Sequence, residues 1–189
     1  VFMVVAAATT TGFQNVTNNQ LTTVFSSGAF LIIAMCMAIG GSSGSTAGGI
    51  KLSRIGLIAK SMVSTIKETL SPSTARVSVR YYHLGRKVLT TDAAKSAMTV
   101  SALFVVTYLI GSLAGIAHGY DAISSIFESV AMASNGGLSS GIVSRGMPPT
   151  LEAVYILEMW AGRLEFVTLL ALVVKVVVSI APRRKAVRS

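Results

Sequence analysis

The first charged residue of this chain is Lys51, and the fifty uncharged residues before it constrain the fold more than any other feature. A second uncharged, mostly apolar run covers residues 96–117. A helix needs roughly 20 apolar residues to cross a lipid bilayer, so this run is long enough to do so. With 52% hydrophobic and 12% charged residues, the chain is also more apolar than ordinary soluble domains. The sequence therefore predicts an all-α membrane protein.

A stretch of small and hydroxyl residues, GGSSGSTAGGIK at residues 40–51, interrupts the apolar sequence. An apolar run at residues 24–39 precedes it, and residues 50–69 carry apolar side chains at helical spacing. A helix that breaks inside a membrane frees backbone carbonyls that lipid cannot solvate, so the break must face water or protein. We therefore expect one membrane crossing in two pieces, with the break lining a pore or cavity.

Three other structures could account for this stretch. A flexible linker would not normally lie between two apolar runs. A phosphate-binding loop needs Gly, four residues, then Gly-Lys-Ser/Thr, whereas here Ile50 separates Gly49 from Lys51 and Leu52 follows. A break that serves only helix packing remains open.

Two short apolar segments are each followed by a polar loop that contains glycine. Residues 1–8 precede Thr9-Thr10-Thr11-Gly12-Phe13, and residues 122–133 precede Ser134-Asn135-Gly136-Gly137-Leu138. Neither apolar segment is long enough to span a bilayer, which is typical of re-entrant pore helices. Because Gly12 and Gly137 are 125 residues apart, we expect one and a half copies of a helix, pore-loop, helix unit.

Loops of this kind can bind an alkali cation, because inward-pointing backbone carbonyls replace its hydration shell and small residues let them converge. Thr10-Thr11-Gly12-Phe13 has the residue classes of the potassium-channel signature Thr-Val-Gly-Tyr. The pair of loops, each placed between a short helix and a spanning helix, is the stronger indication.

Positive charge is concentrated in two zones: nine of the sixteen Lys and Arg lie in residues 51–95, and four lie in residues 182–189. The positive-inside tendency places both zones in the cytoplasm. No interleaved aromatic pattern accompanies them, so we expect no nucleic-acid partner.

Arg163 lies near the middle of the last predicted crossing, residues 151–180. A charge at bilayer depth costs at least about 2.5 kcal/mol, so Arg163 should face a polar partner or an aqueous cavity. Glu128 and Glu165 could pair with it, coordinate ions or serve in ordinary salt bridges. No constellation of residues indicates catalysis, and the single cysteine, Cys36, offers no metal cluster. We expect neither enzymatic activity nor a cofactor.

The chain resembles the membrane subunits of the Trk/Ktr/HKT family of potassium transporters. Four stretches carry the resemblance: the polar loops at residues 9–13 and 134–138, residues 40–51, and Gly162-Arg163-Leu164-Glu165. That family has four pore-loop repeats in one chain. The resemblance implies that residues 1–70 form the end of the third repeat and residues 96–181 the fourth. Residues 71–95 would form a cytoplasmic connection and residues 182–189 a basic cytoplasmic tail.

The resemblance also implies roles for particular residues. The selectivity filter would include Thr10, Thr11, Gly12, Phe13, Asn135, Gly136, Gly137 and Leu138. The gate would be an intramembrane loop together with an arginine beneath the filter: Gly40, Gly41, Ser42, Ser43, Gly44, Ser45, Thr46, Ala47, Gly48, Gly49 and Arg163. Potassium would be the only metal, bound through backbone carbonyls. Asn135-Gly136 departs from the family, whose members often carry Thr or Asn before Val or Leu.

By the same resemblance, we expect potassium or monovalent-cation uptake by a multi-pass protein of the plasma membrane. It would be a homodimer in the lipid bilayer, with a cytosolic nucleotide-binding regulatory subunit as a possible partner. The alternatives are a secondary transporter of another small solute with a broken-helix site, and a non-conducting helical scaffold. The 189 residues alone should be inactive, because two quarters of a filter cannot surround an ion.

Overall fold

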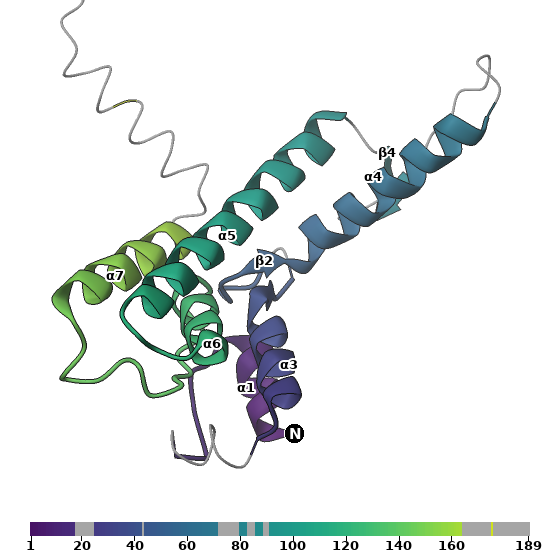
Figure 1. The fold of residues 1–189 in the computed structure, drawn as a ribbon. Helices are drawn as coiled ribbons and strands as arrows, with labels where there is room; N and C mark the ends of the chain where they lie inside the picture. Colours follow the sequence, from purple (N-terminus) through teal and green to yellow (C-terminus); the bar gives the residue numbers. More distant parts are fainter. Residues whose placement is uncertain are drawn as a thin grey trace, which may run out of the picture.

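The computed structural model describes residues 1–17, 25–42, 44–71, 80–82, 86–88, 91–163 and 175. Six helices make up most of this part of the chain (Figure 1): α1 (Phe2–Thr9), α3 (Ser27–Ala38), α4 (Leu52–Leu70), α5 (Thr91–Ala117), α6 (Ala122–Ala133) and α7 (Pro149–Arg163). The predicted all-α architecture is confirmed, with two very short strand pairs as additions.

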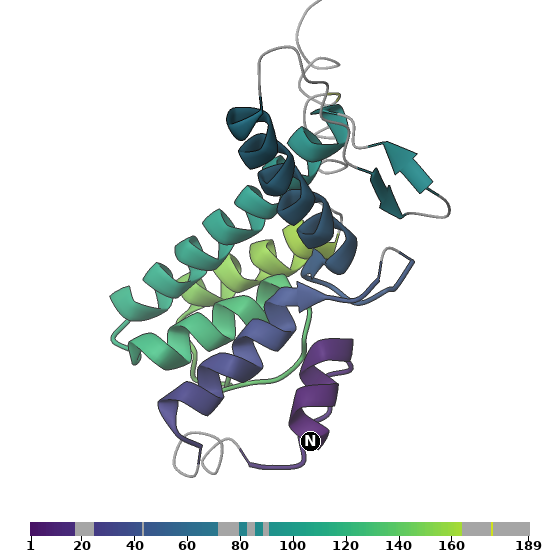
Figure 2. The same cartoon turned by 90° about the vertical axis from the view of Figure 1, so that its right-hand side faces the viewer.

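The helices form two groups that meet along α3 and α6. In one group α1 packs on α3, and in the other α6 and α7 pack on α5 and on each other. Figure 2 shows α5, α6 and α3 lying side by side with a similar slant. The rings of Phe30 on α3 and Phe127 on α6 stack with their centroids 4.3 Å apart. The buried core around them includes Met37 and Leu138, so the two groups share one core.

Helix α5 is the described helix that is long and apolar enough to cross a membrane. Its 27 residues correspond to about 40 Å of helix. Its buried side is lined partly by small residues, among them Ala97, Gly111 and Gly115, while large apolar side chains such as Leu109 and Leu113 are exposed. Small residues at the helix contacts and large apolar ones outside are typical of a helix in lipid.

Helices α3 and α6 each begin with a side-chain cap. The Ser26 hydroxyl accepts a hydrogen bond from the Ala29 amide at the start of α3. Asp121 Oδ2 accepts from the amides of Ile123 and Ser124 at the start of α6. These contacts satisfy amides that the first turn of a helix leaves free, so α3 and α6 begin where the sequence places a capping residue.

The crossing that was predicted to break does break. Helix α3 ends at Ala38, and α4 begins at Leu52. Between them β1 (Ile39–Gly40) pairs in parallel with β2 (Ile50–Lys51), and the Leu52 amide donates to the Gly41 carbonyl. The break is therefore a closed loop with a hydrogen-bonded base, a feature that the sequence did not predict.

Several sequence predictions fall on other parts of the chain. In the predicted cytoplasmic connection, β3 (Arg80–Tyr82) pairs antiparallel with β4 (Arg86–Val88). The last predicted crossing is described as α7 up to Arg163. The remainder of that crossing apart from residue 175, the basic tail, Glu165 and Ser43 lie outside the described residues.

Candidate functional site

The two predicted filter segments leave their short helices with the same backbone conformation. Thr10 and Asn135 have φ of 50° and 52°, and Gly12 and Gly137 have φ of 76° and 72°. The capping bonds also match: the Thr11 amide donates to Ala6 at 3.2 Å, and the Gly136 amide donates to Ala131 at 2.8 Å. Both are bonds of the Schellman type that closes a helix C-terminus. The 125-residue repeat seen in the sequence is thus a repeat of conformation.

The two segments touch through their glycines. A Cβ atom added to Gly137 would lie 2.7 Å from the Gly12 Cα, and one added to Gly12 would lie 3.2 Å from the Gly137 Cα. Both residues also have positive φ, which L side chains adopt at a cost. Glycine is therefore required at both positions by conformation and by space.

The other predicted filter residues differ in burial between the two segments. In the first, Thr10 is half-buried, Thr11 is exposed and Phe13 is 74% exposed. In the second, Gly136 and Leu138 are buried, and the Asn135 side-chain amide donates to the Met159 carbonyl on α7 at 3.2 Å. The second segment is the more firmly embedded of the two.

The Gly/Ser loop lies directly against the ends of both short helices. The Gly48 amide donates to the Thr10 hydroxyl at 3.3 Å, and the Gly48 Cα packs on the Ser134 carbonyl so closely that a Cβ there would overlap it. Residues 47–49 are buried, while residues 44–46 are exposed. Residues 47–49 thus pack against the C-terminal ends of α1 and α6, while residues 44–46, the tip of the loop, are exposed.

Lys51 holds the loop from its base. Its ammonium group donates to the carbonyl oxygens of Ser45 and Ala47, each at 2.6 Å, and its side chain is 9% exposed. The fixed ammonium group balances carbonyls that the broken helix leaves without helical partners. The sequence placed Lys51 at the end of the Gly/Ser stretch and among the basic residues of the cytoplasmic side, but it did not predict that the ammonium group binds the loop.

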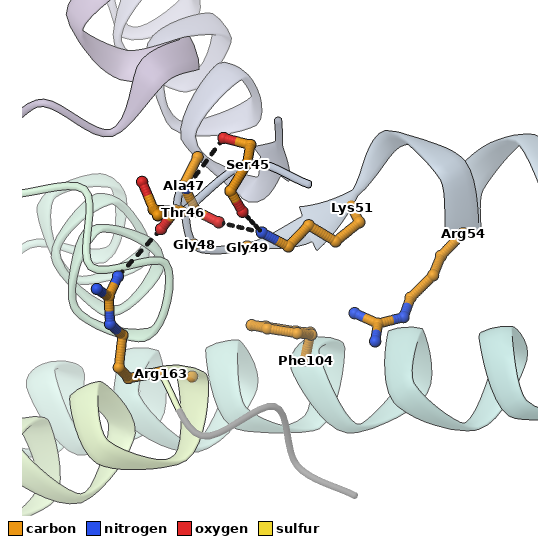
Figure 3. A pocket seen from close by; sticks show the side chains of 10 residues that line it. Ser45, Thr46, Ala47, Gly48, Gly49, Lys51, Arg54, Phe104 and Arg163 are labelled. Atoms are coloured by element: carbon orange, nitrogen blue, oxygen red, sulfur yellow. Dashed lines mark hydrogen bonds between the residues drawn. The ribbon is translucent and has the colours of Figure 1, made fainter. Parts of the chain in front are cut away.

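Arg163 reaches the same loop from α7, as Figure 3 shows, and donates from Nη1 to the Thr46 carbonyl at 3.0 Å. The adjacent Gly162 packs on the Ala133 carbonyl at the end of α6, with no room for a Cβ. Arg163 thus has the polar partner that its position in the last crossing required.

A cavity of about 230 Å³ opens below the loop. Its wall is formed by the loop backbone, Gly162, Phe104 of α5 and the side chains of Lys51, Arg54 and Arg163. Three positively charged side chains therefore surround a space next to loop carbonyls. Within the described residues, no group of three or more His, Cys, Asp or Glu could hold a metal ion, so the oxygens available for a cation here belong mainly to backbone and hydroxyl groups.

Glu128 of α6 is also buried, and within the described part of the chain its hydrogen bonds go to neither Arg163 nor the loop. It is 0% exposed and accepts hydrogen bonds from Ser139 and Ser140, the two residues after the second filter segment. A buried carboxylate requires such partners, and Glu128 is the one charged residue of α6. The single carboxylate in this helix could therefore have indicated from the sequence that polar partners lie nearby, but the sequence does not say which residues those partners are.

The fold is that of a helical membrane transporter in which two short helices are each followed by a glycine-containing loop. The chain matches the family model described as TrkH, cation transport protein, over residues 1–181. It belongs to the TrkH family, as the sequence resemblance predicted, and the expectation that it is not an enzyme is confirmed because this is a family of transporters.

Individual relatives agree with this assignment. An uncharacterized cation transporter of Methanocaldococcus jannaschii is 36% identical over 171 residues, which are 90% of this chain and 35% of that protein. The Trk system potassium uptake protein TrkH of Escherichia coli K12 is 32% identical over 176 residues, 90% of this chain and 34% of that one. The crystal structure of the potassium transporter TrkH from Vibrio parahaemolyticus shares the fold, with a TM-score of 0.71 at 24% identity over 90% of this chain and 36% of that one. The chain spans about a third of the length of these relatives.

Proposed function

We propose that this protein carries potassium ions into the cell through a filter to which residues 10–13 and 135–138 contribute two quarters. The contact between Gly12 and Gly137 is the observation that carries the proposal, because two segments with the same backbone conformation meet there backbone to backbone. Close approach of small residues is what lets carbonyl oxygens converge on a dehydrated cation. The name of the E. coli relative, a potassium uptake protein, supports potassium as the ion.

The loop at residues 40–49 is the gate in this proposal. It lies against the ends of both short helices through Gly48, and polar contacts from Lys51 and Arg163 hold it there. Its exposed tip has few apolar contacts to lose. Ion flow requires the loop to move aside, and the hydrogen bonds of Lys51 and Arg163 oppose that movement.

The proposed setting is a multi-pass protein of the plasma membrane with residues 51–95 and the C-terminus in the cytoplasm. Basic residues on α4, among them Arg54, Lys60 and Lys67, support this orientation through the positive-inside tendency. The proposal also includes a homodimeric membrane protein that binds a cytosolic nucleotide-binding regulatory subunit.

A chimaera tests the function. These residues replace the aligned third of the E. coli TrkH protein in a strain that lacks its own potassium uptake systems. We expect growth at limiting potassium and uptake of rubidium, a potassium tracer, at rates within the range of the intact E. coli protein. A chimaera that reaches the membrane in normal amounts but supports neither growth nor uptake would refute the proposal.

A further inference from the structure

We propose that Glu128 is a positioning residue that fixes the far end of the fourth-repeat filter segment and, through Ser139 and Gln14, its spacing from the third-repeat segment. Ion selectivity would then depend on a side chain that touches no ion. This inference rests on the proposed function, since it concerns the same filter.

The geometry around Glu128 holds the chain just after the filter residues. Oε2 accepts from the Ser140 amide at 2.7 Å and from the Ser140 hydroxyl at 2.6 Å, and Oε1 accepts from the Ser139 hydroxyl at 2.9 Å. The helix C-terminal cap holds the near end of the segment at Asn135 and Gly136. Residues 135–138 are therefore held at both ends by α6 itself.

The charge of Glu128 makes this attachment strong. An ionised carboxylate only accepts hydrogen bonds, and bonds to a charged acceptor are shorter and stronger than neutral ones. The carboxylate is fully buried, so a lost donor leaves charge without compensation. Ser139, Ser140 and Gly141 carry no apolar side chain, so between the buried residues Leu138 and Ile142 these hydrogen bonds hold the chain.

A further hydrogen bond links this segment to the one at residues 10–13. The Ser139 amide donates to Gln14 Oε1 at 3.3 Å. Gln14 directly follows Phe13 and corresponds to Ser139 in the 125-residue repeat. The far ends of the two filter segments are thus hydrogen-bonded to each other, with Ser139 attached on its other side to Glu128.

The third repeat has no carboxylate at the matching place. With the 125-residue spacing, Glu128 corresponds to Met3, which is buried and packs in the shared apolar core. Among the described residues, this charged attachment is found on the fourth repeat, and the bond through Gln14 extends it to the third.

The test uses the chimaera described above and measures the potassium-to-sodium permeability ratio. Glu128→Gln replaces an acceptor oxygen with a donor amide, which conflicts with the donors of Ser139 and Ser140, and we expect the ratio to fall about tenfold, the factor that corresponds to loss of one such bond. Ser140→Ala removes one donor and should lower the ratio about threefold. Ser140→Thr keeps the hydroxyl group and should therefore keep the parental permeability ratio. Glu152→Gln, the same change at an exposed position on α7, is the matched control.

The outcomes separate this inference from the proposed function. A parental ratio in Glu128→Gln, or in Ser140→Ala if Glu128→Gln does not reach the membrane, overturns the inference and leaves the proposed function standing. A parental chimaera that does not distinguish potassium from sodium overturns the proposed filter, and the inference with it. A loss of uptake in Ser140→Ala and Ser140→Thr alike, with the ratio unchanged, would show that Ser140 matters only for folding and would also overturn it.

Discussion

The proposed filter segments at residues 10–13 and 135–138 share a backbone conformation but are held in different ways. The first follows an eight-residue helix, exposes Phe13 and offers the Thr10 hydroxyl to the loop. The second buries Leu138 in the shared core and is attached to Glu128 and to Met159 of α7. The repeat therefore specifies the path of the backbone, while each copy uses its own side chains to stabilise that path.

The difference also suggests that the second segment serves as the more rigid of the two. It has buried apolar, charged and amide anchors, whereas the first depends on contacts with its neighbours, Gly48 and Ser139. Rigidity in a packed structure follows from the number of buried contacts and satisfied hydrogen bonds. Four groups of variants test how differently these parts of the molecule are held.

The largest effect is expected where the segments touch. Gly137→Ala and Gly12→Ala both place a side chain at positive φ, which costs about 1–2 kcal/mol. In both variants the new Cβ atom would also press against the backbone of the other segment. We expect each to lower the potassium-to-sodium permeability ratio of the chimaera at least about tenfold. Gly137→Ala should be worse, because its Cβ would lie 2.7 Å from Gly12 while that of Gly12 would lie 3.2 Å from Gly137.

Gly146→Ala is the control, since nothing lies within 4 Å of a Cβ there. Unchanged ratios in both glycine variants would remove these segments from the filter.

A large loss of stability is expected in the helix packing of the fourth repeat. A Cβ on Gly111 of α5 would overlap the buried carboxylate of Glu158 on α7, so Gly111→Val should destabilise the chimaera by about 3 kcal/mol. On α4, Gly56 has open space around it, and Gly56→Ala should raise stability by up to about 1 kcal/mol through helix propensity. Thermal unfolding of the purified protein in detergent measures both, and equal midpoints for the two variants would contradict the difference.

A smaller change, in ion flux, is expected from the side chains that hold the loop. Lys51→Met removes a buried ammonium group together with its two hydrogen bonds to the loop. We expect this change to raise ion flux about tenfold, because it destabilises the closed position of the loop. Arg163→Gln removes a single bond made by an exposed side chain, so we expect about a twofold increase. Flux in vesicles at matched protein amounts is the measurement.

Deletion of residues 43–47 removes the carbonyl acceptors of both cations and should raise flux as well. Lys67→Met, at an exposed position of α4, should leave it unchanged. If the folded loop variants conduct no faster than the parent, the loop is structural and the gate proposal fails.

The smallest effects are expected at the side-chain caps of α3 and α6. Asp121 accepts from two amides, at 3.1 and 3.2 Å, whereas Ser26 accepts from one at 3.4 Å. Asp121→Ala should therefore cost about 1 kcal/mol and Ser26→Ala about 0.5 kcal/mol. The same thermal unfolding measurement ranks the two variants, and a larger cost at Ser26 than at Asp121 would contradict this order.

Local signals in the sequence predicted the helices closely in some places and less closely in others. The short helix expected at residues 122–133 is α6, Ala122–Ala133, with the same bounds, and the crossing expected to end near residue 117 does so at Ala117. The second half of the broken crossing was predicted from residue 50, but α4 begins at Leu52 because Ile50 and Lys51 pair with β1. Apolar residues in a very short strand pair cannot be distinguished from a helix by periodicity.

By itself, the sequence determined the membrane class of this protein, the place of the helix break, the 125-residue repeat and the residues beside the site. These depend on hydropathy, glycine content and the recurrence of a short motif, all of which can be read along the chain without knowing which residues meet in space. Tertiary structure alone decided that Gly12 meets Gly137, that Lys51 is buried against loop carbonyls, and that Glu128 binds Ser139 and Ser140 rather than Arg163. Such contacts depend on how separate helices and loops pack, and many alternative pairings satisfy the same local pattern until the packed core excludes them.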